Sequence, residues 1–302
     1  MMQETLPITR FLKTGPRHPA FSVPESDPTF WVPEDVSRFL ATVHHRSEQG
    51  ERVNALLVGP TGTGKSSLPR ECAALWGRPF FSMHCQLVTE QGDWWGLRQL
   101  SNDQGTYFDT AALVDAIETP GCVVLLDEAN RTHPENLNAL FGLLDHRRSA
   151  WVPALQREVV VAPGVVFFVT VNRGLEYVGT NSVDKAMRDR ISNTVFLSFP
   201  PQEVEASLLT QRTRVSPDSA KRLVRFATTV RGNRKVVMSV STRQLLECAA
   251  LIAGGLALNE AVRFAVVNGA EEETERTALL QALQMSDVQS AGLRRIFEDD
   301  DR

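Results

Sequence analysis

Residues 59 to 66 read GPTGTGKS and fit the phosphate-binding pattern GxxxxGK[ST]. The apolar run VNALLVG, residues 53–59, comes before this stretch, and a helical pattern follows it, which is the context that a phosphate-binding loop requires. Glycines let the backbone turn tightly and aim N–H groups at phosphate oxygens, and the N-terminus of the next helix adds positive potential. The stretch therefore predicts a nucleotide-phosphate site in an α/β fold, with a glycine-rich turn and a solvent-exposed lysine as the alternative.

The residue types within this loop indicate separate tasks. We expect Lys65 to reach the β and γ phosphates and the Ser66 hydroxyl to ligate Mg²⁺. The residues that we expect to contact the nucleotide are Gly59, Pro60, Thr61, Gly62, Thr63, Gly64, Lys65, Ser66 and Ser67.

Five short apolar runs are spread over the first two thirds of the chain. They occupy residues 53–59, 79–85, 122–128, 165–172 and 193–199. Most are near-continuous rather than alternating, which is typical of strands buried on both faces, as in a parallel sheet. Helical patterns separate the runs, so the sequence predicts an α/β fold with a five-stranded parallel, doubly wound sheet.

Helix signals flank these runs. Residues 132–135, ThrHisProGlu, fit a capping box, and a stripe of apolar residues at i, i+3, i+4 and i+7 follows. The stripe consists of Leu137, Leu140, Phe141 and Leu144.

The strand pattern ends near Pro200, and only helical patterns follow. Ser216 and Ser241 fit N-caps of two of these helices. We therefore expect an extended lead-in over 1–30, a nucleotide-binding core over 31–200, a small all-helical domain over 201–297 and an acidic tail over 298–302.

An acidic pair follows the third apolar run. Asp127 and Glu128 stand at its carboxyl end, which is the sheet edge where α/β proteins bind ligands. We expect Asp127 to hold Mg²⁺ through water and Glu128 to orient the water that attacks the γ-phosphate. Asn172 ends the fourth run and is expected beside the pair, where it can hydrogen-bond that water or the phosphate. The alternative is a solvated turn.

Bulk properties exclude several classes of protein. The chain has 302 residues, a net charge of −4 and a pI of about 5.9, which argues against duplex DNA as the main partner. The four cysteines form no CxxC pair and the six histidines no HxxxH pair with nearby acids, so we expect free thiols and no such metal site. No apolar run approaches the about 18 residues that span a bilayer, and the N-terminus does not resemble a secretory signal. We expect a cytoplasmic protein.

The motifs, taken in order, resemble those of the AAA+ ATPases. GPTGTGKS, LLDEANR, VTVN, AMRDR and STRQLLE are similar to Walker A, Walker B, sensor 1, arginine finger and sensor 2, and together cover about residues 31 to 265. The stretches around Walker B and after sensor 1 resemble the MoxR branch. Within it, the chain is most similar to the subgroup of Q-type Rubisco activases (CbbQ), nitric-oxide-reductase activation ATPases (NorQ) and the small cobaltochelatase ATPase subunit.

This resemblance implies a ring, a hexamer, with ATP and Mg²⁺ at the subunit interfaces. It implies that the ring remodels or activates a client protein, with a partner that carries a von Willebrand factor A domain. By resemblance Arg190, with Arg188 as second choice, is the finger that reaches a neighbour's ATP, and Arg243 is sensor 2. The family pattern Asp-Arg-Phe is Asp-Arg-Ile here because Ile191 replaces the phenylalanine. The alternative is that these are surface arginines.

Two other functions stay open. One is a nucleic-acid-directed NTPase motor of a restriction system, similar to McrB, although residues 172–176 read NRGLE where McrB-like proteins carry Asn-Thr-x-Asp-Arg. The other is a switch that binds a nucleotide without hydrolysing it.

Two further segments carry structural expectations. Trp94 and Trp95 lie in a segment that either contacts a client or braces a loop on the core. Residues 148–162 fit a hairpin, in which Pro153 would suit only an edge strand.

Overall fold

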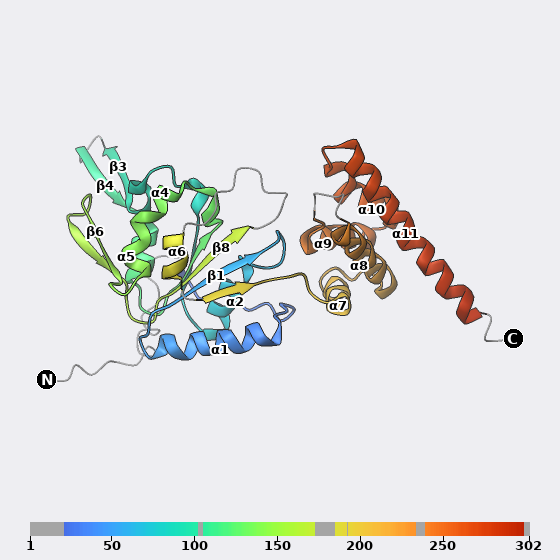
Figure 1. Cartoon of the computed structure of the whole chain (residues 1–302), viewed down its shortest axis with the longest axis horizontal. Coiled ribbons are helices and arrows are strands. Elements are labelled where there is room, and N and C mark those ends of the chain that lie inside the picture. Colours follow the sequence, from blue (N-terminus) through green and yellow to red (C-terminus); the bar gives the residue numbers. More distant parts are fainter. Residues whose placement is uncertain (1–20, 102–104, 173–184, 192, 234–238, 299–302) are drawn as a thin grey trace. The chain divides into compact units, whose positions relative to one another are not determined.

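The computed structural model describes residues 21–101, 105–172, 185–191, 193–233 and 239–298 (Figure 1). Contacts divide these residues into two compact units. The first extends to Leu197 and the second begins at Ser198, while residues 60–63 group with the second unit. Within the described ranges, no helix is long and apolar enough to cross a membrane.

A five-stranded parallel sheet forms the centre of the first unit, in the order β2-β5-β8-β1-β9. The strands are β1 Val53–Gly59, β2 Phe80–His84, β5 Val123–Asp127, β8 Val166–Asn172 and β9 Asn193–Phe196. Every residue of β1, β5 and β8 is buried, which explains why most of their residues are apolar. The predicted α/β fold is confirmed, and each of the five apolar runs forms one strand.

Helices cover both faces of this sheet. Helices α1 Glu34–Glu48 and α2 Ser67–Trp76 pack on one face, against side chains such as Leu57 and Phe168. Helix α3 Ala112–Glu118 and the segment around α4 Pro134–Leu137 and α5 Phe141–Leu144 pack on the other face. Short 3₁₀ turns lie at η3 Cys85–Leu87, η4 Gln91–Trp94, η5 Ala129–Arg131, η6 Asn138–Leu140 and η7 Val267–Gly269.

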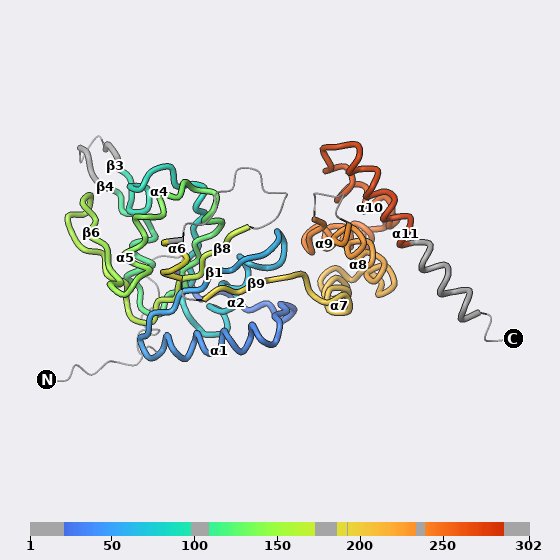
Figure 2. Tube along the Cα trace, viewed as in Figure 1, coloured from blue at the N-terminus to red at the C-terminus, as the bar shows by residue number. Residues whose placement is uncertain are grey.

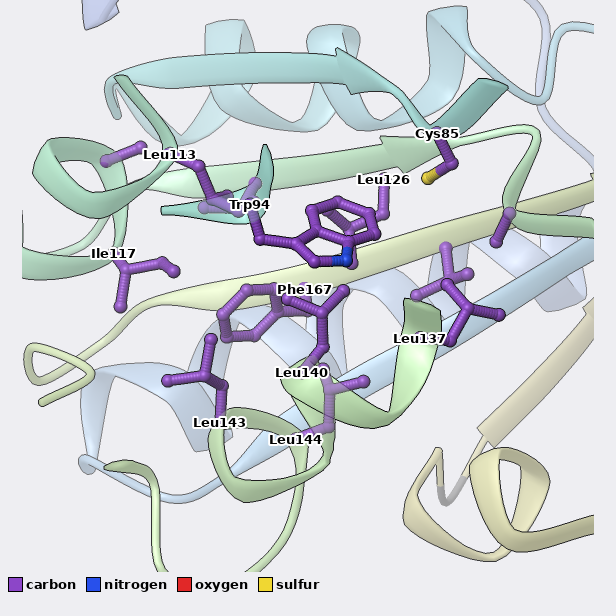
Figure 3. Close-up of a cluster of buried hydrophobic side chains, with 14 of the residues drawn as sticks. Cys85, Trp94, Leu113, Ile117, Leu126, Leu137, Leu140, Leu143, Leu144 and Phe167 are labelled. Atoms are coloured by element: carbon purple, nitrogen blue, oxygen red, sulfur yellow. The ribbon is translucent and has the colours of Figure 1, made fainter. Parts of the chain in front are cut away.

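The indole of Trp94 lies in the middle of the layer that α3, α4 and α5 form against the sheet. It is fully buried among leucines of α3, β5 and η6 (Figure 3), and its Nε1 donates to Asn136 O over 2.8 Å. Trp95 is buried as well. The two indoles therefore brace their loop on the core, and the alternative of direct client contact is wrong for these side chains.

Two small hairpins extend from the sheet layers. One pairs β3 Gly96–Ser101 with β4 Gly105–Thr110. The other pairs β6 Ser149–Val152 with β7 Arg157–Val160, which confirms the hairpin expected within 148–162. Pro153 lies in its turn, so it interrupts no ladder hydrogen bond.

The predicted capping box at 132–135 is wrong. The N-cap of α4 is His133, without a side-chain cap, and the Thr132 hydroxyl instead donates to Val88 O over 2.8 Å. Thr132 is buried, so its hydroxyl needs an acceptor within the protein, and the bond to Val88 O holds the loop around Val88 in place. The apolar stripe is nevertheless correct, since Leu137, Leu140 and Leu144 are buried.

The described part of the lead-in packs on the first unit. Phe21 is fully buried with its ring edge-on to Phe81, and the N–H of Phe80 donates to Ser22 O. The segment then continues toward α1 (Figure 2), with Phe30 and Val32 against the α1–α2 layer. Residues 21–30 are therefore part of the folded unit, whereas residues 1–20 lie outside the described ranges.

The second unit is helical. Its helices are α7 Gln202–Thr213, α8 Pro217–Gly232, α9 Thr242–Ala253, α10 Leu258–Ala265 and α11 Glu273–Glu298. Both predicted N-caps are confirmed: Ser216 accepts from Ser219 N, and Ser241 forms a capping box with Gln244. Residues 299–302 of the expected acidic tail lie outside the described ranges.

Candidate nucleotide site

The strand register brings the candidate residues of the first unit to one sheet edge. Gly59 at the end of β1 is the partner of Asn172 at the end of β8. Asp127 at the end of β5 is the partner of His84 at the end of β2. Because all these strands are parallel, their carboxyl ends form one edge, and the chemistry expected from the sequence gathers there.

The loop after β1 has the backbone that its glycines predict. Gly62 and Gly64 have φ of +78° and +87°, values that residues with a Cβ rarely adopt. Lys65 is buried, and its Nζ donates to Gly59 O over 2.8 Å, so its side chain lies back along the loop. The Gly64 carbonyl accepts from Leu68 N at the beginning of α2, so loop and helix are continuous.

A chain of hydroxyl groups joins this loop to the acidic strand end. Ser66 Oγ donates to Asp127 Oδ1 over 2.9 Å, and Thr170 Oγ1 donates to the same oxygen over 2.5 Å. Thr170 Oγ1 in turn accepts from Glu128 N over 2.8 Å. His84 Nδ1 lies 3.5 Å from Asp127 Oδ2. Asp127 is thus held by side chains from two neighbouring strands, β2 and β8, and from the loop.

The carboxylate of Glu128 is fixed at both oxygens. Asn172 Nδ2 donates to Oε1 over 2.7 Å, and Arg131 Nε lies 2.9 Å from Oε2. Asn130 Nδ2 donates to Asn172 O, which adds a second link between the same two segments. The backbone of Glu128 has φ 54° and ψ 47°, a left-handed conformation that costs a non-glycine residue of order 1 kcal/mol and is found preferentially at functional sites.

The neighbouring thiol is affected by these acids. Burial raises the pKa of Cys85, and the carboxylates of Asp127 and Glu128 raise it further. Cys85 is therefore an uncharged packing residue under this edge of the sheet.

The oxygens at this edge suit magnesium. Ser66 Oγ and Asp127 Oδ1, which lie 2.9 Å apart, are hard oxygen ligands of the kind that magnesium prefers. Mg²⁺ is usually held in proteins by one or two such groups, with substrate phosphates and water completing its octahedron. The described residues contain no group of three or more His, Cys, Asp or Glu that could hold a metal ion. The residues present fit an ion that is shared with a nucleotide.

Helix α6, Lys185–Arg190, carries both candidate finger arginines, and their side chains have different surroundings. Met187 and Ile191 anchor it in the core. Arg190 is turned inward: its guanidinium lies 4.3 Å from the centre of the Phe141 ring, and Nη1 donates to Ala186 O. Arg188 is exposed.

Arg243 lies on the second unit. It is exposed in the first turn of α9, two residues after the N-cap Ser241. The stretch that resembles the MoxR branch after sensor 1 lies largely within 173–184, outside the described residues.

Sequence reasoning missed four residues of this site: His84, Asn130, Arg131 and Thr170. Thr170 carried a signal, since it is the one hydroxyl residue within the apolar run 165–172 and lies two residues before Asn172, on the same strand face. The other three depend on strand order and loop path, which their own sequence does not reveal.

Comparisons with known proteins agree with this architecture. Residues 54–191 match the family model "AAA domain (dynein-related subfamily)", and residues 205–286 match "CbbQ/NirQ/NorQ C-terminal". The chain is 36% identical over 262 residues to "Putative chaperone BssE" of Thauera aromatica, covering 86% of this chain and 88% of that protein. It is 25% identical over 242 residues to an uncharacterized protein, SSP1341, of Staphylococcus saprophyticus, covering 77% and 90%.

Solved structures share the fold at low identity. The Holliday junction branch migration motor RuvB of Thermotoga maritima is 16% identical with a TM-score of 0.52, covering 87% of this chain and 72% of that one. The AAA domain of FIGL-1, in complex with ADP, is 14% identical with a TM-score of 0.54, covering 92% and 89%.

The parallel sheet with its phosphate loop, followed by a helical C-terminal region, is the AAA+ fold. The relative at 36% identity and the C-terminal family match narrow the assignment. The chain belongs to the MoxR/CbbQ type of AAA+ ATPases, as its motifs indicated.

Proposed function

We propose that this chain hydrolyses ATP with Mg²⁺ at interfaces between copies arranged in a hexameric ring, and uses the energy to remodel or activate a client protein. The observation that carries the proposal is the joined pair of contacts at the sheet edge. Ser66 donates to Asp127, and Asn172 donates to Glu128, so the pair that we propose to hold the metal lies beside the pair that we propose to orient the water.

Each residue at this edge has a task that its geometry supports. Ser66 and Asp127 would hold Mg²⁺, directly and through water, and the ion would neutralise phosphate charge. Lys65 would move from the Gly59 carbonyl to the β and γ phosphates, while the amides of the loop bind the same oxygens. Glu128 would orient and polarise the attacking water, and Asn172 would hold Glu128 in place.

In the proposed ring, each ATP site needs an arginine from the neighbouring subunit. Arg188 is exposed on α6, whereas Arg190 is engaged with Phe141 of its own subunit and lies 3.9 Å from Asp145 Oδ2. We therefore favour Arg188 as the finger and Arg190 as the residue that anchors α6, the reverse of the order expected from the sequence. Arg243, exposed at the beginning of α9, would bind nucleotide as sensor 2.

The proposed action on a client protein is supported by similarity to other proteins. The 36% identical protein is described as a putative chaperone. The partner with a von Willebrand factor A domain is proposed from the motif resemblance alone. The likeness to RuvB extends to the fold alone, and the net charge of −4 gives no support to a DNA motor.

Steady-state hydrolysis and native mass, measured together, test the proposal. We expect an ATPase whose rate per subunit falls on dilution below the ring's dissociation constant, and a hexamer mass with ATP. Lys65→Ala and Glu128→Gln should abolish turnover, while Glu128→Gln should still bind ATP. Glu34→Gln, an exposed carboxylate on α1, is the matched control and should have wild-type activity. Full turnover by the monomer would contradict the ring, and a rate stimulated by DNA in a salt-dependent way would favour the nucleic-acid alternative.

A further inference from the structure

Glu71 is a buried carboxylate on the helix that follows the phosphate loop. It lies in the second turn of α2, and 7% of its surface is exposed. Both of its oxygens accept hydrogen bonds from the lead-in: Oε1 from the Ser26 hydroxyl, and Oε2 from Asp27 N over 2.9 Å. A buried charge is costly unless it is hydrogen-bonded, so undocking the lead-in would leave this carboxylate unsatisfied.

The docked segment turns immediately after these contacts. Asp27 Oδ1 accepts from the backbone N–H and the hydroxyl of Thr29, and Asp27 O accepts from Phe30 N. This turn fixes the direction in which the Phe30 side chain leaves the backbone.

The ring of Phe30 lies against the phosphate loop itself. Its Cε2 and Cζ atoms are 3.4 Å from the position that a Cβ on Gly64 would take. Gly64 has a positive φ, and its carbonyl begins α2 by accepting from Leu68 N. Phe30 also packs into the layer formed by α1, α2 and the sheet. The lead-in therefore spans α2 from Glu71 back to the loop.

We infer that Glu71 is a positioning residue for nucleotide binding: it fastens the lead-in to α2, and the fastened lead-in, through Phe30, holds the phosphate loop in its binding shape at Gly64. The inference rests on the nucleotide binding within the proposed function, but not on the ring or on the client. A binding loop that is already shaped loses less freedom when it takes up phosphate, so loosening it lowers affinity without touching the residues that orient water.

The test separates affinity from turnover. In the full chain, Glu71→Ala should raise the Kd of a fluorescent ATP analogue and the KM for ATP about tenfold, equivalent to about 1.4 kcal/mol. The value of kcat should stay within about twofold of wild type, because the residues at the strand ends are unchanged. Phe30→Ala should behave in the same way, and Phe30→Leu, which keeps apolar contact with Gly64, should recover most of the affinity.

Further variants check that one connection carries the effect. The double variant Phe30→Ala/Glu71→Ala should bind no more weakly than the weaker single variant, since both remove the same brace. Ser26→Ala should give a smaller loss, and Glu71→Gln, which keeps an acceptor for Ser26, an intermediate one. Arg70→Ala, an exposed neighbour on α2, is the matched control and should bind ATP normally.

Unchanged Kd and KM in Glu71→Ala, with only a lower melting temperature, would overturn the inference and leave Glu71 a purely structural residue. A loss of kcat at unchanged KM would overturn it as well. If Glu71→Ala does not fold, unchanged affinity in both Ser26→Ala and Phe30→Ala has the same consequence. Failure of the wild-type chain to bind ATP would instead count against the proposed function.

Discussion

The side-chain amide of Asn172 donates to Oε1 of Glu128 over 2.7 Å, and the bond joins segments that extend from two adjacent parallel strands, β8 and β5. Removing this donor frees a carboxylate whose direction matters for the attacking water. We expect Asn172→Ala to lower kcat by about 10²-fold, the effect of losing one positioned polar group, with KM for ATP nearly unchanged. Steady-state kinetics check this, and a raised KM at normal kcat would contradict it.

Thr170 links both acidic residues through one hydroxyl, since it donates to Asp127 and accepts from Glu128 N. Thr170→Val keeps the shape but leaves the partly buried N–H of Glu128 without its acceptor, so the free energy of unfolding should fall by about 1 kcal/mol. The Mg²⁺ concentration needed for half-maximal turnover should rise, because Asp127 loses a restraint. Urea unfolding and a magnesium titration measure the two effects, and Thr170→Ser should restore both.

The alanine variants of Arg188 and Arg190 should differ in whether added guanidinium ion restores their activity. We expect Arg188→Ala to lower kcat by about 10³-fold, as for a finger arginine, and to be partly rescued by added guanidinium ion. Arg190→Ala should lower the melting temperature through lost contact with Phe141 and should not respond to guanidinium. Mixing Arg188→Ala with Lys65→Ala subunits should restore turnover, because some interfaces then carry both intact parts. Rescue of Arg190→Ala alone would reverse our assignment.

The four cysteines should be inert toward alkylation in the folded chain. All four are buried and unpaired, and burial raises the pKa of Cys72 and of Cys248 to about 12. The pKa of Cys85 and of Cys122 is raised in the same direction. At pH 8 the reactive thiolate is therefore depleted, and iodoacetamide should label all four thiols only after denaturation. Rapid labelling of the native chain would show that the core opens locally.

Asp145 should contribute a pH-dependent part of the stability. The Arg147 side chain hydrogen-bonds the Asp145 carboxylate and lowers the pKa of Asp145 below its usual range. The unfolded state then binds the proton more readily, so this contribution is present above about pH 4 and is lost as the pH falls through the lower, folded-state pKa. Asp145→Asn should be less stable than wild type at pH 7, and the difference should vanish in acid. Urea unfolding at pH 7 and near pH 3 tests the sign.

Local motifs were enough to predict that the phosphate-loop pattern, the acidic pair and Asn172 would meet at one edge of the sheet. Each depends on a residue type at a strand end, and parallel strands bring their ends together whatever their order in the sheet. The partners Arg131 and His84 were not predictable in this way. Their contacts require knowing that β2 neighbours β5 and how the chain leaves β5, which are properties of the whole sheet.

The error at Thr132 has a related cause. Its spacing to Glu135 fits a cap, but the hydroxyl is buried next to the Val88 carbonyl, and that acceptor prevails. Glu71 is a second case in which tertiary contacts matter, because both of its hydrogen-bond partners lie more than forty residues earlier in the sequence. Tertiary hydrogen bonds decided both cases.

Strand β8 carries consecutive aromatic rings that point into opposite layers, Phe167 into one and Phe168 into the other. A shift of one residue along β1 and β5 would exchange these rings between cavities of different shape and would also turn Val171 toward the site in place of Asn172. The two phenylalanines thus fix the register of β8, and with it the position of Asn172 at the end of the strand. A smaller side chain at either position would misplace Asn172 while the domain as a whole stays folded.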